Sequence, residues 1–197
     1  MQAVPQPAAD SGPSLVGELK AWVLVAAAAL GLAGFFALLL AISRIPGVEA
    51  VFAWPVGFFH KGLVIHVVFS FVVWFLAVFG ALAALVSPAL APAGRPRRQI
   101  LGSCGLGSVA AAGTALAMPL LFVPALLDRG EATLNNYIPV IIDPLYYTGL
   151  AVLFAAQAWL AVRLVPIARW PLLRAAPAAA AVVAAAVMLL LAIAAFG

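Results

Sequence analysis

Residues 58–86 read FFHKGLVIHVVFSFVVWFLAVFGALAALV, and this stretch decides the fold class. Lys61 is its one formally charged residue, and apolar side chains fill nearly every other position. The run is longer than the roughly 20 apolar residues that an α-helix needs to cross about 30 Å of hydrocarbon. Because a spanning segment must satisfy its own backbone hydrogen bonds, the stretch predicts a transmembrane helix.

Four further apolar runs of comparable length accompany it, one before and three after. The sequence therefore predicts an all-α, polytopic membrane helix bundle of five transmembrane helices, with spans at about 19–42, 58–86, 100–126, 144–165 and 172–196. Residues 1–16 are rich in Pro, Ala and Ser and predict a flexible cytoplasmic tail. Residues 17–197 predict a single transmembrane helical domain. The first run is longer than the apolar core of a secretory signal peptide and ends without a small-residue cleavage site, so we expect it to be retained.

The overall composition supports this fold class. Of the 197 residues, 67% are hydrophobic and 8% are charged, whereas soluble domains have about 45–50% and 25%. These proportions exclude a soluble enzyme, a disordered chain and a nucleic-acid-binding domain, and the expected surroundings are a lipid bilayer. Cys104 is the only cysteine, so an intrachain disulfide is impossible, and we interpret it as a small packing residue.

Basic residues separate by side when the five spans are threaded through a membrane. One side holds Lys20, Arg95, Arg97, Arg98, Arg163, Arg169 and Arg174, and the other holds Arg44, Lys61 and Arg129. The positive-inside rule places the richer side in the cytoplasm. The sequence therefore predicts that the N-terminus is inside and the C-terminus outside. In a bacterium the chain would be an integral protein of the inner (cytoplasmic) membrane.

The two histidines lie near the outer end of the second span. Six residues separate His60 from His66, which corresponds to about 240° around a helix, so the two rings cannot bind one metal ion from the same helix. His66 is the deeper of the two. It is either a heme ligand or proton-handling group, or a neutral imidazole hydrogen-bonded to a neighbouring helix. We interpret His60 as a hydrated residue of the membrane interface, with heme binding as the alternative after His66.

A second polar group precedes and opens the fourth span. It includes Asn136, Tyr137 and Asp143. Asp143 stands directly before Pro144, which predicts a helix N-cap followed by proline at the first helical position. The alternative is a functional pairing of Asp143 with His66 or with an arginine near the outer surface. Tyr137, Tyr146 and Tyr147 are typical of an aromatic belt at the interface.

Residues 66–88, HVVFSFVVWFLAVFGALAALVSP, resemble the second transmembrane helix of heme-copper oxidase subunit I, in the superfamily of cytochrome c oxidase and nitric oxide reductase. That helix carries a histidine near its outer end, followed by an aromatic-rich apolar run with a glycine. The resemblance implies that His66 is an axial heme ligand and that the chain belongs to a respiratory electron-transfer complex. Its implied extent is the N-terminal four or five helices of that subunit.

The chain also departs from that family. The family subunit has about twelve helices and further histidines that complete its heme and copper sites, whereas this sequence has two histidines. The resemblance therefore implies a truncated relative, at most a non-autonomous part of an oxidoreductase complex, with other membrane subunits as partners. Two alternatives remain: a heme-free structural or assembly protein that packs against other subunits, and a small transporter.

Overall fold

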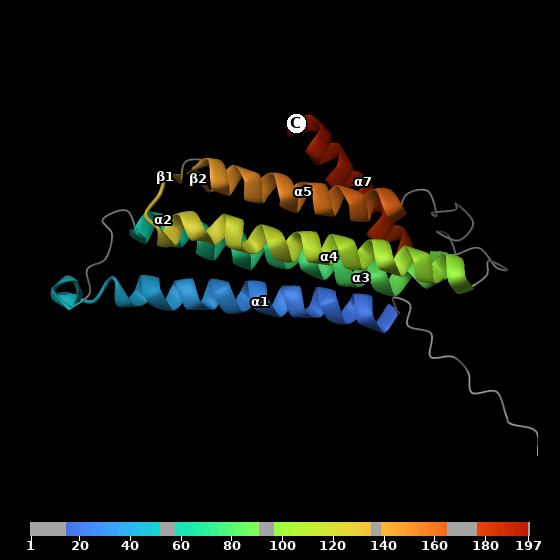
Figure 1. Cartoon of the computed structure of the whole chain (residues 1–197), viewed down its shortest axis with the longest axis horizontal. Helices are drawn as coiled ribbons and strands as arrows, with labels where there is room; N and C mark the ends of the chain where they lie inside the picture. The colour runs from blue at the N-terminus through green and yellow to red at the C-terminus, as the bar shows by residue number, and fades with distance from the viewer. Residues whose placement is uncertain (1–14, 52–57, 91–96, 135–138, 165–176, 197) are drawn as a thin grey trace, which may run out of the picture.

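The computed structural model describes residues 15–51, 58–90, 97–134, 139–164 and 177–196. Four long helical rods run along the long axis of the molecule (Figure 1). They are α1 (Leu15–Ile42), a composite second rod, α4 (Arg97–Leu126) and α5 (Pro144–Leu164). The second rod consists of α2 (Phe58–Val67), the π-helical segment η2 (Val68–Val73) and α3 (Trp74–Leu90).

The remaining elements are short or inclined. A 3₁₀ turn, η1 (Val48–Ala50), follows α1, and the strands β1 (Glu131–Thr133) and β2 (Val140–Ile142) form an antiparallel hairpin between α4 and α5. The last helix, α7 (Pro177–Phe196), contacts α5 and α3 and is inclined to the other rods in Figure 1.

Successive rods run in opposite directions. The C-terminal ends of α1 and α4, the N-terminal ends of α2 and α5, and both strands lie at one end of the bundle (Figure 1). We call this the hairpin end. The side to which the sequence assigns Arg44, Lys61 and Arg129 corresponds to this end.

Length and composition make this a membrane bundle. Within the described residues, four helical stretches are long and apolar enough to cross a bilayer: Leu15–Ile42, Phe58–Ser87, Gly105–Leu126 and Pro144–Val162. The chain is therefore an integral membrane protein with an all-α fold, as the sequence predicts. In α7, the stretch Ala179–Leu190 is a shorter apolar helix, so a fifth crossing stays a prediction. The tail predicted for residues 1–16 lies almost wholly outside the described residues, and α1 begins at Leu15, four positions before the expected start at Leu19.

Small residues let the rods approach closely. Water does not drive helices together inside a membrane, so close van der Waals packing has to hold them. A Cβ on Gly80 of α3 would overlap the indole of Trp22 in α1, and a Cβ on Gly113 of α4 would lie 3.0 Å from the Cβ of Ala156 in α5. Glycine at position 80 is thus required by the close approach of α1 and α3.

One buried polar contact crosses the bundle between α4 and α5. Gln157 Nε2 donates a hydrogen bond to Thr114 Oγ1 at 3.0 Å, and Thr114 Oγ1 donates in turn to the carbonyl of Ala110 at 2.9 Å. Both side chains are fully buried. Gln157 Oε1 has no hydrogen-bond partner among the described residues.

Candidate functional site at the hairpin end

His66 lies at the contact between the second rod and α1. Its Nδ1 is 2.9 Å from the carbonyl oxygen of Ala33, and the imidazole is half-buried. A carbonyl oxygen only accepts hydrogen bonds, so Nδ1 carries the hydrogen, and in the neutral ring Nε2 keeps its lone pair. This contact fixes both the tautomer and the orientation of the ring.

The backbone departs from α-helical geometry close to His66, where α2 ends at Val67. The π-helical segment η2 begins two positions after His66, at Val68. Ser70 Oγ donates to the carbonyl of His66 at 2.7 Å and lies 3.3 Å from the carbonyl of Val67. Such side-chain bonds satisfy carbonyl groups where the regular i to i−4 ladder is interrupted. Single π turns within α-helices occur frequently at functional sites, and this one places His66 at the junction.

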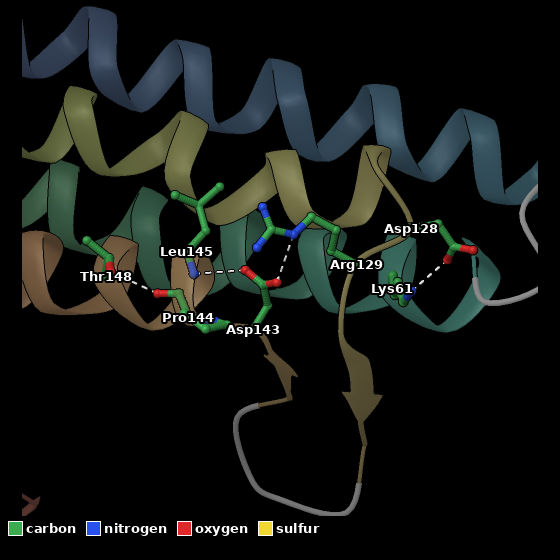
Figure 2. Close-up of polar contacts among 7 residues, drawn as sticks. All are labelled: Lys61, Asp128, Arg129, Asp143, Pro144, Leu145 and Thr148. Atoms are coloured by element: carbon green, nitrogen blue, oxygen red, sulfur yellow. Dashed lines mark hydrogen bonds and ion pairs between the residues drawn. The ribbon is translucent and has the colours of Figure 1, made fainter.

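Two ion pairs tie the hairpin end together (Figure 2). Lys61 Nζ of α2 lies 2.6 Å from Asp128 Oδ1, and Arg129 Nε lies 3.1 Å from Asp143 Oδ2. Asp128 and Arg129 are consecutive, yet one reaches α2 and the other reaches the residue that precedes α5. The turn after α4 therefore joins three rods through charged side chains.

Asp143 has the capping role that the sequence predicts. Its Oδ1 accepts a hydrogen bond from the backbone N–H of Leu145 at 2.8 Å, and α5 begins at Pro144. Its other oxygen binds Arg129. The sequence left His66 and an arginine as possible partners of Asp143, and the structure brings it together with the arginine.

The turn that supports these pairs has a tightly constrained backbone. Asp128 has φ 51° and Gly130 has φ 65°. A Cβ on Gly130 would overlap the carbonyl oxygen of Ile142 in the facing strand, so glycine is required where the hairpin starts. At Asp128 the left-handed conformation is one that aspartate tolerates better than most residues.

A hollow of about 330 Å³ opens beside the Lys61–Asp128 pair. Its lining residues come from α2, the turn after α4 and β1: His60, Lys61, Asp128, Gly130, Glu131 and Ala132. Lys61 forms its buried side, while His60 and Glu131 are exposed. His60 therefore belongs to this hollow and not to the α1 contact that holds His66.

The remaining expected residues are distributed as follows. Asn136 and Tyr137 lie outside the described residues. Tyr146 is fully buried, so its assignment to an exposed aromatic belt is wrong, whereas Tyr147 is 48% exposed and fits that assignment. Consecutive side chains of a helix point about 100° apart, so Tyr146 can face the bundle while Tyr147 faces outward.

Sequence reasoning missed the Lys61–Asp128 and Thr114–Gln157 contacts. The available signals were a lone lysine in an apolar run and a lone glutamine in another, both of which are costly unless paired. The partner could not be named without knowing which helices are neighbours. Within the described residues, no three His, Cys, Asp or Glu side chains are grouped so that they could hold a metal ion.

Comparison with known proteins adds no assignment. No protein-family model, no curated protein and no solved structure matches the chain.

Proposed function

We propose that the chain is a heme-binding subunit of a membrane electron-transfer complex, with His66 as an axial ligand of the iron. The observation that supports this is the hydrogen bond from His66 Nδ1 to the Ala33 carbonyl. Metal-ligating histidines almost always donate their second ring N–H to a carboxylate, a backbone carbonyl or water, which fixes the tautomer and raises the basicity of the ligating nitrogen. His66 has this arrangement, with Nε2 left for iron.

The residues fit half of such a site. His66 supplies one oriented imidazole, and the chain has only one other histidine, His60, which lies in the hollow at the hairpin end. A histidine as the second axial ligand would therefore come from a partner membrane subunit, or that position would be left to another kind of ligand. Bound heme would supply one-electron transfer, and His66 would hold and orient it. The chain alone would be a part of an oxidoreductase and not a complete enzyme.

The test is optical. The protein is purified in mild detergent from its native membrane, and reduced-minus-oxidised spectra are recorded for wild type, His66→Ala and His60→Ala. We expect a b- or a-type heme band that His66→Ala abolishes and His60→Ala retains. Size-exclusion profiles and unfolding temperatures separate loss of heme from loss of fold. Absence of a heme band in intact wild-type protein would overturn the proposal, as would an unchanged band in His66→Ala.

A heme-free packing subunit is the second candidate, and one observation favours it. On α1, no atom of the described residues outside the local helix backbone lies within 4 Å of a Cβ placed at Gly31 or Gly34, and both glycines are exposed. Exposed small residues on a transmembrane helix allow another helix to approach. Subunits that co-purify with wild type but are lost from a Gly31→Leu/Gly34→Leu variant, in a preparation without heme, would support this second function.

A further inference from the structure

The hollow at the hairpin end has groups of both charge signs in a small space. Lys61 and His60 supply hydrogen-bond donors, and Asp128 and Glu131 supply carboxylate oxygens. The Lys61 side chain is 6% exposed, and its ammonium is 2.6 Å from Asp128, whose side chain is 42% exposed. Asp128 thus satisfies the buried ammonium while still facing the hollow.

This charge pattern selects the kind of ligand. The Asp128 and Glu131 carboxylates would repel a simple anion, and the Lys61 ammonium would repel a simple cation. A zwitterion avoids both repulsions, because its anionic group can lie against Lys61 and His60 and its cationic group against Asp128 and Glu131. Hydrogen bonds between such charged groups are about twice as strong as neutral ones.

The position of the hollow indicates where that zwitterion comes from. The spans Phe58–Ser87 and Gly105–Leu126 begin and end beside it, so it lies at the depth of lipid headgroups. The two residues directly before Asp128 are exposed and apolar: Leu126 is 47% and Leu127 is 62% exposed. A ligand with a charged head and apolar chains would contact both features.

We propose that this hollow binds the headgroup of a zwitterionic phospholipid that carries a primary ammonium, such as phosphatidylethanolamine. The phosphate would accept hydrogen bonds from Lys61 and His60. The ammonium would donate to Glu131 and Asp128. A primary ammonium has three N–H donors, whereas the quaternary ammonium of a choline headgroup has none, so the site discriminates between the two. The proposal does not depend on heme at His66.

The experiment measures lipid binding to the full chain by native mass spectrometry from detergent micelles. The probes are phosphatidylethanolamine, phosphatidylcholine and phosphatidylglycerol with identical acyl chains. We expect phosphatidylethanolamine to bind about fivefold to tenfold more tightly than the other two, the range that the net contribution of one ordinary hydrogen bond supplies in a hydrated site. Equal binding of phosphatidylcholine would overturn the role of the ammonium, and equal binding of phosphatidylglycerol would overturn the zwitterion.

Variants assign the preference to the hollow. Glu131→Gln and His60→Ala change exposed side chains of the hollow. Thr148→Val changes an exposed side chain of α5 whose hydroxyl donates to the carbonyl of Pro144 in its own helix. We expect Glu131→Gln to reduce the preference to below about twofold and Thr148→Val to leave it intact. Unfolding temperatures in phosphatidylcholine establish that the variants are folded. We expect His60→Ala to weaken the binding of all three lipids, because they share the phosphate. A preference that survives Glu131→Gln, or binding of all three lipids that His60→Ala leaves unchanged, would overturn the site.

Soluble phosphoethanolamine distinguishes a lipid from a free metabolite. It carries the same phosphate and primary ammonium but lacks acyl chains. We expect it to bind at least about tenfold more weakly than phosphatidylethanolamine, because it forgoes the contacts with Leu126 and Leu127. Equally tight binding of the soluble compound would assign the hollow to a soluble ligand and overturn the lipid proposal.

Discussion

The Lys61 ammonium lies 2.6 Å from the carboxylate of Asp128, a residue 67 positions later in the chain. The lysine side chain is 6% exposed and that of the aspartate is 42% exposed, so the pair joins a buried cation to a partly hydrated anion. It connects the start of α2 to the turn after α4 (Figure 2). The contact therefore closes the hairpin end of the bundle.

Removing the carboxylate is expected to destabilise the protein. Asp128→Asn leaves the Lys61 ammonium buried without its counter-charge, at a cost of about 1–3 kcal/mol in the free energy of unfolding. Adding Lys61→Met to that variant removes the buried charge, so we expect the double variant to recover at least half of the loss. Unfolding in a mixed-micelle denaturant series measures wild type, the Asp128→Asn and Lys61→Met single variants, and the double variant. Strictly additive effects of the two substitutions would contradict a coupled pair.

Gly80 is expected to be intolerant of even one methyl group. Gly80→Ala places a Cβ inside the space held by the Trp22 indole, and overpacking of this kind costs about 1–3 kcal/mol. Gly34→Ala is the matched control, because Gly34 is also a helical glycine but no described atom of another helix lies within 4 Å of the added Cβ. There we expect no loss, and a gain of up to about 1 kcal/mol from helix propensity. Equal stability of the two variants would show that α1 and α3 do not approach as closely as described.

Asp143 has two roles that substitution can separate. Asp143→Asn keeps an oxygen that accepts from the N–H of Leu145 but loses the charge that faces Arg129, whereas Asp143→Ala loses both contacts. Loss of an N-cap costs about 0.5–2 kcal/mol, and the half-exposed Arg129 pair contributes less, about 0–1 kcal/mol. We therefore expect Ala to destabilise more than Asn in thermal unfolding. The reverse order would argue that the charge, and not the cap, is the main contribution.

Some helix ends were predictable from the sequence, and the others differ from the prediction by one to five positions. Predicted and observed ends coincide at Ile42, Phe58, Leu126 and Pro144, because charges, glycines and prolines interrupt the apolar runs there. Asp143 before Pro144 is a local signal whose partner, the Leu145 N–H, is two positions away. The β1–β2 hairpin was not predicted, since strands of three residues are too short to show an alternating pattern.

The contacts between rods were not predictable. Lys61 and Asp128 stood out only as charges on one side of the membrane, and nothing in either segment says that α2 and α4 are neighbours. The same holds for Thr114 and Gln157, and for the Ala33 carbonyl that orients His66. These pairings depend on helix order within the bundle, which apolar periodicity does not encode when a helix is apolar on every face.

The Thr114–Gln157 pair predicts an asymmetry between its two truncations. Thr114→Val removes the acceptor of Gln157 Nε2 and leaves the whole amide buried without a partner among the described residues, which costs about 1–2 kcal/mol. Gln157→Leu removes the amide, including an oxygen that already has no such partner, so we expect a change within about 0.5 kcal/mol. Denaturant unfolding compares the two. A larger loss for Gln157→Leu would mean that the glutamine oxygen has a partner in the membrane-embedded protein.

The orientation inferred from the basic residues predicts which residues can be labelled from outside. Three rods separate Lys20 at the start of α1 from Glu131 in β1, and both side chains are exposed. The variants are made in a Cys104→Ser background and expressed in the inner membrane of a bacterial host. A membrane-impermeant maleimide added to spheroplasts of that host should label Glu131→Cys at once and Lys20→Cys only after permeabilisation.

Each labelling outcome tests a different step of that argument. Labelling of both positions from the same side would contradict three crossings, and so would contradict the bundle as a membrane structure. Labelling of Lys20→Cys alone would keep the crossings but reverse the orientation inferred from the basic residues. Gly197→Cys tests the predicted fifth span. It should react from outside, like Glu131→Cys, if both α5 and α7 cross the bilayer. Protection of Gly197→Cys in spheroplasts, with Glu131→Cys labelled, would mean that only one of the two helices crosses.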